Sequence, residues 1–230
     1  MVKSGIDRGL RELTDAVHAE GAAAAIQIGH CGYFATPAVT GQRTMGPSRV
    51  FNTYGMTFPR PMTDEDIRSV ADDFATAAVR ARDCGFDAIE LHAGHGYLIS
   101  QFLSQYTNRR RDQWGGSLEN RFRFAKLVLQ RVREALGPDY PILAKMNLRD
   151  GFDGGLELDE AVEVAKMGVL EKYNVEMIGA SIPSIQKAED RDLFRKAMDK
   201  INLRIPASGI ATTMEEVREI AEQIGFPIIV

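Results

Sequence analysis

Apolar residues recur at two spacings along the chain, and segments of the two kinds alternate. Apolar positions three and four residues apart predict amphipathic helices, and these segments cover residues 4–21, 63–85, 118–137, 158–174, 188–200 and 213–225. Short, nearly continuous apolar runs predict buried strands, and these runs cover residues 22–29, 86–91, 140–147, 175–181, 203–209 and 226–230. Residues 30–62, rich in Gly, Pro and Thr, are predicted to be irregular. Six helix–strand pairs in this order predict a parallel sheet covered by helices.

Polar residues at the starts of three predicted helices support these assignments. Ser4 and Asp7 have the spacing of a capping box, and Thr63 precedes the second helix as an N-cap. Ser117 and Asn120 have N-cap spacing at the start of the third helix. We therefore expect these residues to have structural roles.

Two α/β architectures contain a parallel sheet of this kind: a doubly wound open sheet and a (β/α)8 TIM barrel. No G-x-G-x-x-G motif follows the first predicted strand, which weakens the dinucleotide-binding alternative. The longest polar segments follow the carboxyl ends of strands, where both folds place their sites. The sequence favours the barrel.

The number of predicted strands is lower than a complete barrel requires. A barrel has eight βα units in about 250 residues, whereas this chain of 230 residues shows six. The chain also begins on a helix and stops at the end of a strand, so both ends look cut. We expect residues 1–230 to form a single, incomplete barrel domain.

Composition narrows the class of protein. The net charge of −4 argues against nucleic acid or an anionic membrane as a partner held by bulk charge, and the basic run Arg109–Arg111 is predicted to be a solvated or ion-paired loop. No segment resembles a signal peptide or a membrane span. The two cysteines, Cys31 and Cys84, form no C-x-x-C pattern, which argues against an iron–sulfur cluster or a structural zinc site. These features predict a reduced, cytoplasmic protein.

The motif "HAGHGY" contains His92, His95 and Tyr97 at the tip of a predicted strand that ends at Leu91. One interpretation is a zinc site, but it needs a third protein ligand besides the two histidines. Candidates for that ligand are His18, His30, Cys31, Glu90 and Asp112. A second interpretation is hydrogen bonding within the loop. The third is a polar substrate site, in which two imidazole N–H groups hold a developing oxyanion and the phenol gives up a proton.

The segment "GFDAIELHAGHGYLISQFLSQYTNRRRDQWGGSLENRFRF" resembles the signature of the old yellow enzyme family of FMN-dependent ene-reductases, which includes a dienoyl-CoA reductase-like branch. The resemblance extends from "DAVHAEGAAAAIQIGHCG" through "MGPSR" to "ILAKMNLRDGFDGG" and covers residues 1–182. It implies a TIM barrel whose strands 3 to 8 correspond to the six predicted here. It also implies FMN as cofactor, with NADH or NADPH as the reductant.

The resemblance implies roles for individual residues. His92 and His95 match the histidine pair that binds the carbonyl oxygen of an enone above the flavin, and Tyr97 matches the tyrosine that protonates the alkene carbon. Gln27 matches the glutamine that contacts the flavin pyrimidine. Lys145 matches the cation beside the flavin N1/O2 edge, although a lysine that simply extends to solvent is the alternative. The implied substrate is a small molecule with an electron-poor alkene.

Further residues of the resembling segment are predicted to support the site. His30 matches a position near the cofactor or serves its own loop, and Gly115 with Gly116 permits a tight turn. Asn108, Arg110 and Asp112 are expected to form a hydrogen-bonded scaffold, and Trp114 to fill space. The remaining residues, expected to shape the backbone, are Asp150, Gly154 and Gly155.

The chain also departs from the family pattern. Tyr33 stands where many members carry arginine, and Gly209, in Ser208-Gly209-Ile210, stands where a Gly-Gly pair binds the FMN phosphate. The chain shows no counterpart of the first two βα units of the family's barrel or of the segment after its eighth strand, which complete the flavin site in the family. Three functions therefore stay open: an FMN-dependent ene-reductase, a non-catalytic barrel remnant or assembly partner, and a metal-dependent barrel hydrolase. A homo-oligomer is a further expectation.

Overall fold

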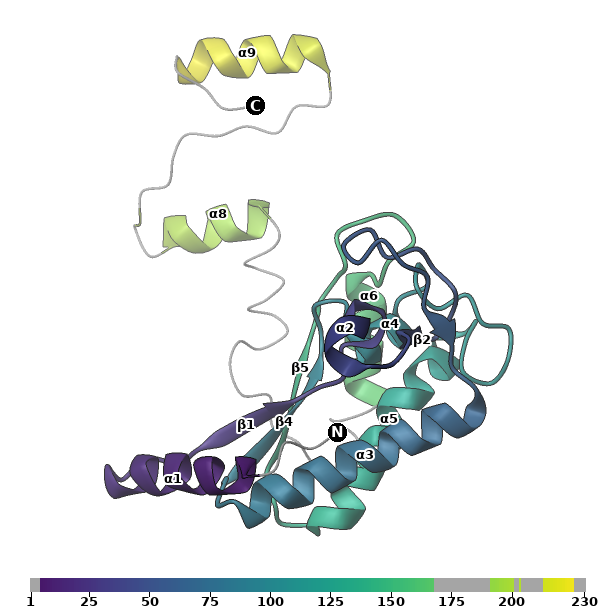
Figure 1. Cartoon of the computed structure of the whole chain (residues 1–230). Helices are drawn as coiled ribbons and strands as arrows, with labels where there is room; N and C mark the ends of the chain where they lie inside the picture. Colours follow the sequence, from purple (N-terminus) through teal and green to yellow (C-terminus); the bar gives the residue numbers. More distant parts are fainter. Residues whose placement is uncertain (1–4, 168–190, 201–202, 204–212, 226–230) are drawn as a thin grey trace. The chain divides into compact units, whose positions relative to one another are not determined.

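The computed structural model describes residues 5–167, 191–200, 203 and 213–225 (Figure 1). The chain divides into two compact units, Met1–Val175 and Glu176–Val230. The described part of the second unit contains two predicted helices, α8 (Arg191–Lys200) and α9 (Met214–Ile224). The strands predicted at 175–181, 203–209 and 226–230, apart from Leu203, lie outside the described residues. The single-domain expectation stays a prediction.

A three-stranded parallel sheet forms the centre of the first unit. Its strands are β1 (Ala25–Ile28), β4 (Ala88–Ala93) and β5 (Ile142–Met146), in the order β1-β4-β5. Successive strands of this sheet are therefore neighbours within it, as in a (β/α)8 barrel. Ile89 and Leu91 in the central strand are buried, but β1 alternates between exposed and half-buried residues. The expectation that β1 is buried is wrong, because Ala25 and Gln27 point away from the helix-covered face and are exposed, whereas Ile26 and Ile28 point toward it and are half-buried.

Two long helices, α3 (Asp64–Asp83) and α5 (Leu118–Leu136), connect the strands of the sheet. Helix α1 (Ile6–Ala19) precedes β1, and α6 (Leu158–Ala165) follows β5. Thr63 and Asp66 form a capping box at the start of α3, and the Ser117 hydroxyl accepts a hydrogen bond from the Asn120 backbone N–H at the start of α5. Both predicted N-caps are confirmed. In α1 the N-cap is Gly5, and Ser4 lies outside the described residues.

Helices α3 and α5 run side by side along the sheet and close its apolar face (Figure 1). Phe74 and Ala78 from α3 and Phe124 from α5 join Ile89 and Leu91 of β4 in one buried cluster. Burial of such side chains contributes about 1.5–3 kcal/mol each relative to full exposure. The opposite face of the sheet is therefore the one left for polar chemistry.

Residues 30–62 were predicted to be irregular, and the structure adds several short elements there. These are η1 (Gly32–Phe34), α2 (Pro37–Thr40), β2 (Met45–Gly46) and β3 (Arg60–Pro61). The strands β2 and β3 pair with each other in parallel. The segment is thus a connection with its own short elements between β1 and α3, on the side of the sheet where the strands end.

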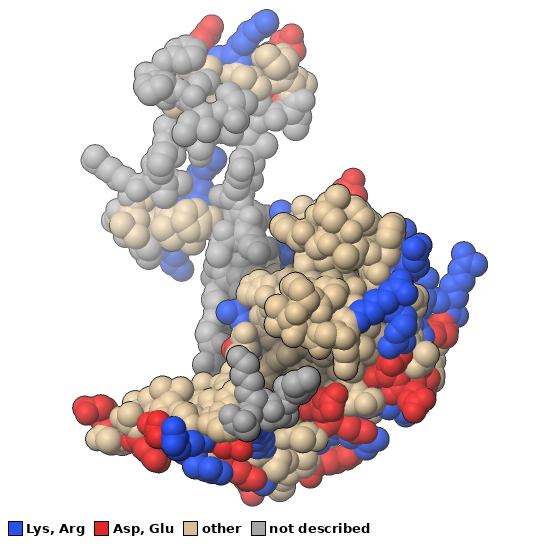
Figure 2. Space-filling view, viewed as in Figure 1, with Lys and Arg blue, Asp and Glu red and all other residues tan. Residues whose placement is uncertain are grey.

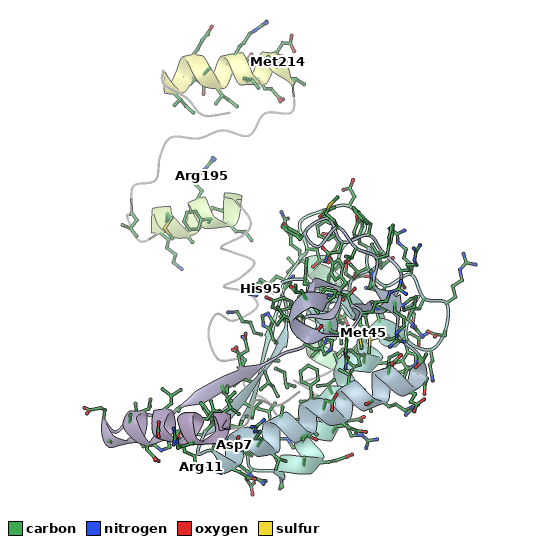
Figure 3. All side chains as sticks on the ribbon, in the orientation of Figure 1. Asp7, Arg11, Met45, His95, Arg195 and Met214 are labelled. Carbon is green, nitrogen blue, oxygen red and sulfur yellow. The ribbon has the colours of Figure 1, made fainter. Side chains whose placement is uncertain are left out.

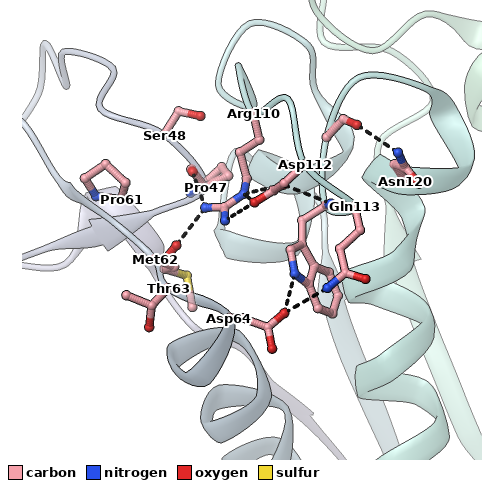
Figure 4. A network of polar contacts seen from close by, with 12 residues as sticks. Pro47, Ser48, Pro61, Met62, Thr63, Asp64, Arg110, Asp112, Gln113 and Asn120 are labelled. Atoms are coloured by element: carbon pink, nitrogen blue, oxygen red, sulfur yellow. Dashed lines mark hydrogen bonds and ion pairs between the residues drawn. The ribbon is translucent and has the colours of Figure 1, made fainter.

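Arg110, held by Asp112, binds this connection to the loop that follows α4 (Leu98–Leu103). The Arg110 guanidinium donates to the backbone carbonyl oxygens of Pro47, at 3.0 Å, and of Met62, at 2.7 Å, and pairs with Asp112 at 2.6 Å (Figure 4). Buried Asn108 donates to the carbonyl oxygens of Phe102 and Trp114. The predicted hydrogen-bonded scaffold is confirmed.

Trp114 fills space as predicted, and it also binds α3. It is 3% exposed, and its indole N–H donates to Asp64 at 2.8 Å (Figure 4). Gly116 has a φ of 84°, and a Cβ at Gly115 would lie 2.6 Å from the Arg110 Cβ. The double glycine is therefore required by the turn that follows Trp114.

Positive and negative side chains are mixed along α1 and α3 (Figure 2). Arg80 on α3 pairs with Asp7 on α1 (Asp7 is labelled in Figure 3), and Arg68 pairs with Asp64 within α3. Arg110, the middle residue of the basic run, is ion-paired, as expected. In the parts of the chain that the structure describes, each helix is too short or too polar to cross a bilayer.

Candidate active site

The pairing of the three strands brings separately predicted residues to one face of the sheet. Gln27 in β1 is aligned with Glu90 in β4, and His92 in β4 is aligned with Lys145 in β5. Aligned residues, and residues two apart in a strand, point to the same face of a parallel sheet. Gln27, Glu90, His92 and Lys145 therefore share the face opposite to α3 and α5.

Glu90 is a component of this face that the sequence interpretation considered only as a metal ligand. The Gln27 side-chain N–H donates a hydrogen bond to the Glu90 carboxylate, so the two polar side chains satisfy each other. The sequence contained an indication of this, because Glu90 and His92 lie two residues apart in an otherwise apolar strand and therefore point to the same face. A ligand of Gln27 competes with Glu90 for the amide.

His92 lies inside β4 rather than beyond it, because the strand continues to Ala93 instead of ending at Leu91. The extension is paired with β5, where Met146 is aligned with Ala93. The His92 side chain is 4% exposed. Its Nε2 lies 3.3 Å from Nδ1 of His95, and its ring centroid lies 4.9 Å from that of Tyr97. The structure thus brings the three residues of the motif together.

Burial lowers the pKa of His92, and the nearby positive charges of His95 and Lys145 lower it further, whereas Glu90 opposes them. His92 is therefore neutral at pH 7. Because its Nε2 and the His95 Nδ1 face each other, one of the two nitrogens donates and the other accepts. The buried Nδ1 of His92 has no hydrogen-bond partner within the described ranges.

Tyr97 combines a backbone role with a side-chain role. It is the N-cap residue of α4, and its carbonyl oxygen accepts from the Gln101 N–H at 2.8 Å. Its half-buried ring lies edge-on to Phe34, with 6.2 Å between centroids, and Phe34 in turn contacts Tyr33 and Tyr54. An aromatic cluster from residues 33–54 therefore borders the motif, and the sequence interpretation did not identify Phe34.

Gln101 holds the loop after β1 against the loop after β4. Its side chain is 1% exposed. The amide donates to the carbonyl oxygens of Gly96, at 2.6 Å, and of Cys31, at 3.2 Å, and accepts from the Tyr33 N–H at 3.2 Å. This role could not be predicted from local sequence patterns, because two of the partners lie on a distant loop and the third on the preceding turn.

His30 serves the same loop. Its Nδ1 accepts a hydrogen bond from the Gly32 backbone N–H at 3.0 Å, and its carbonyl oxygen accepts from the Leu98 N–H at 2.9 Å. The loop-structural interpretation of His30 is therefore what the described contacts support.

We expect the substitution Gly32→Ala to lower the free energy of unfolding by about 2–4 kcal/mol, as the sum of backbone strain and overpacking. Gly32 has a φ of 59°, and a Cβ there would lie 2.4 Å from Oε1 of the buried Gln101. Gly41→Ala is the matched control, because Gly41 has a φ of 68° with no atom within 4 Å of its Cβ position. Urea denaturation followed by circular dichroism measures both. Equal losses would show that Gln101 is not held as described.

Lys145 and Gly209 complete the set of predicted cofactor ligands. Lys145 is exposed on β5, and no carboxylate of the described residues lies within ion-pair distance of it. Gly209 lies outside the described residues. Within the described ranges no three His, Cys, Asp or Glu side chains are grouped closely enough to hold a metal ion, so a zinc site at the histidine pair has no ligand set there.

The sequence profile of the NADH:flavin oxidoreductase / NADH oxidase family matches residues 4–212. The chain belongs to this family. A relative named NADH oxidase, from Thermoanaerobacter brockii, is 43% identical over 174 residues, which are 75% of this chain and 26% of the relative. A relative named NADPH dehydrogenase, from Listeria welshimeri, is 39% identical over 172 residues, or 75% of this chain and 49% of the relative. The chain thus spans about a quarter to a half of the length of these family members.

Solved structures of family members have the same fold. A 2-naphthoyl-CoA reductase in complex with 2-naphthoyl-CoA superimposes with a TM-score of 0.68 at 35% identity, covering 72% of this chain and 27% of that one. Morphinone reductase in complex with tetrahydroNAD gives a TM-score of 0.63 at 31% identity, covering 71% and 49%. The predicted resemblance to the old yellow enzyme family and the incomplete TIM barrel are confirmed. The family also supports FMN with a nicotinamide reductant and an oxidoreductase rather than a hydrolase.

Proposed function

We propose that the chain carries the substrate-binding side of an FMN-dependent oxidoreductase that reduces electron-poor C=C bonds with NADH or NADPH. The observation that carries the proposal is the contact of His92, His95 and Tyr97 at the end of β4, beside the sheet face opposite to α3 and α5, which carries Gln27 and Lys145. Family membership supports the flavin and nicotinamide chemistry. The named relatives act on different compounds, so the substrate class is inferred from the site.

The residues present fit a flavin. Gln27 supplies an amide and Lys145 a cation on the same face of the sheet, and Lys145 has no competing ion pair among the described residues. A cation at this position stabilises the negative charge of a reduced flavin. When bound, FMN supplies the hydride that the amino-acid side chains cannot. The Gln27 amide must leave Glu90 to bind it.

The histidine pair fits the carbonyl oxygen of the substrate. A neutral imidazole N–H donates to an oxygen that gains negative charge as the alkene is reduced, and a donor within a water-excluded site stabilises that charge strongly. His92 is 4% exposed and is kept neutral by its lowered pKa. It therefore acts as a hydrogen-bond donor and not as an acid.

Tyr97 fits the proton donor. Its ring centroid lies 4.9 Å from that of His92, and the ring also contacts Phe34 edge-on. The phenol O–H can give its proton to the carbon next to the carbonyl group, while the aromatic neighbours limit the access of water to that carbon. Tyr97→Phe removes the proton and keeps these ring contacts.

The proposal is tested with the purified chain titrated with FMN and assayed anaerobically with 2-cyclohexenone and either NADH or NADPH. We expect uptake of FMN, oxidation of the nicotinamide and formation of cyclohexanone, with no turnover of cyclohexanone itself. A folded chain that takes up FMN and oxidises NADH or NADPH without reducing the enone would refute the substrate class. A folded chain that takes up no FMN would instead favour the non-catalytic alternative.

A further inference from the structure

His95 has a backbone conformation that residues other than glycine rarely adopt. Its φ is 57°, and Met56 is the one other described non-glycine residue with a positive φ. The left-handed region costs roughly 1–2 kcal/mol for an ordinary residue. The turn that contains it, continued by Gly96 with a φ of 71°, brings the exposed His95 ring to His92. A contact from outside the turn is needed to hold this conformation.

Asn147 provides such a contact from the neighbouring strand. Its Oδ1 accepts a hydrogen bond from the His95 backbone N–H at 2.9 Å. Asn147 directly follows β5, and the alignment of Ala93 with Met146 brings the next residues of both strands close together. Gly94 leaves the necessary space, because a Cβ there would lie 2.8 Å from Asn147 Oδ1.

Asp150 determines which way the Asn147 amide faces. The Asn147 Nδ2 donates to Oδ1 of Asp150 at 3.2 Å, and Oδ2 of Asp150 accepts from the Leu156 backbone N–H at 2.8 Å. The Asp150 N–H donates to the Leu156 carbonyl oxygen at 2.9 Å, and Leu156 is 2% exposed. A chain of hydrogen bonds thus connects the core at Leu156 with the backbone of His95.

We propose that Asn147 and Asp150 are positioning residues that hold His95 in the orientation in which its imidazole meets His92 and the substrate oxygen. An amide is needed at position 147, because one atom accepts from His95 while the other donates to Asp150. The link to catalysis rests on the proposed function. Neither residue touches the reacting atoms; each acts through the His95 backbone.

The first test measures the backbone of His95 directly. In ¹⁵N-labelled protein without cofactor, we expect Asn147→Leu and Asn147→Asp to increase hydrogen exchange at the His95 amide by about tenfold, because the first removes the acceptor and the second places two carboxylates side by side. With FMN bound, kcat/KM for 2-cyclohexenone is expected to fall on the order of 10- to 100-fold, as for a displaced catalytic group. Asn120→Leu is the control, since it removes a similar side-chain hydrogen bond, to the Gly115 carbonyl oxygen, outside the site.

The second test exchanges the two side chains. The double substitution Asn147→Asp with Asp150→Asn keeps an acceptor for His95, an acceptor for the Leu156 N–H and one N–H between the pair. We expect it to restore exchange and kcat/KM to within about threefold of the unsubstituted chain. A double variant no better than Asn147→Asp, or unchanged His95 exchange in folded Asn147→Leu, would overturn the proposal. If the unsubstituted chain with FMN reduces no enone, the proposed function fails, but His95 exchange still decides the positioning role.

Discussion

Replacing Arg121 with methionine is expected to lower the free energy of unfolding by about 3–5 kcal/mol, the usual result of removing one partner of a buried ion pair. Arg121 is 1% exposed. Its guanidinium pairs with Glu160 of α6 and donates to the carbonyl oxygens of Leu103 and, at 3.2 Å, of Gly116. One side chain therefore joins α5 to α6, to the end of α4 and to the glycine turn. Its removal leaves two carbonyl oxygens without this donor and leaves the Glu160 carboxylate without its ion pair, with the Gln105 amide as its remaining donor among the described residues.

Urea denaturation of the Arg121→Met variant measures this loss. Arg131→Met is the matched control on the same helix, because Arg131 is 42% exposed and pairs with Asp72 and Glu134 at the surface. Exposed pairs of this kind contribute about 0–1 kcal/mol. Adding Glu160→Gln to Arg121→Met is expected to recover part of the stability, since the unpaired charge is then gone. Similar losses in the two single variants would contradict the role given to Arg121.

Replacing His92 with leucine is expected to lower kcat/KM for the enone by about 10²–10³-fold, the usual effect of losing one oxyanion donor. Leucine fills much of the space of the buried ring but makes no hydrogen bond with the substrate or with His95. Affinity for FMN is expected to stay within about threefold, because Gln27 and Lys145 are unchanged. Steady-state kinetics and FMN titration give the two values.

His18→Leu is the matched control for His92. His18 is exposed on α1 and pairs with Asp87 at 2.8 Å, away from the motif, so the kinetics are expected to be unchanged. Loss of FMN binding in His92→Leu, with turnover proportional to the flavin bound, would show that His92 holds the cofactor and not the substrate oxygen.

The lowered pKa of His92 also predicts the direction in which the free energy of unfolding changes with pH. A histidine whose pKa in the folded chain lies below the ordinary value of about 6.5 stays neutral at that pH, while the unfolded chain begins to bind a proton. Its contribution to stability is therefore complete above about pH 6.5 and decreases as the pH falls below it. In His92→Leu this part of the stability profile is expected to be absent.

Local patterns in the sequence were sufficient for most of the secondary structure. The apolar spacing of residues 63–85 and 118–137 predicted α3 and α5, because the face of each helix that repeats every three to four residues is the face buried against the sheet. Thr63 and Ser117 marked the helix starts, since an N-cap depends on atoms within three residues. The motif that begins at His92 was equally visible, because its side chains are neighbours in the sequence.

The sequence alone determined the long helices α1, α3 and α5, the cores of β1, β4 and β5, the family and the histidine–tyrosine motif of this protein. The tertiary structure decided how far β4 extends, which residue faces Lys145, and how Gln101, Arg121 and Asn147 are used. Each of these depends on strand alignment or on a partner in a separate element, as in the bond between His95 and Asn147, 52 residues apart. Periodicity and capping record which face of an element is buried, whereas the identity of a distant partner is set only when the elements pair and their polar groups must find donors and acceptors.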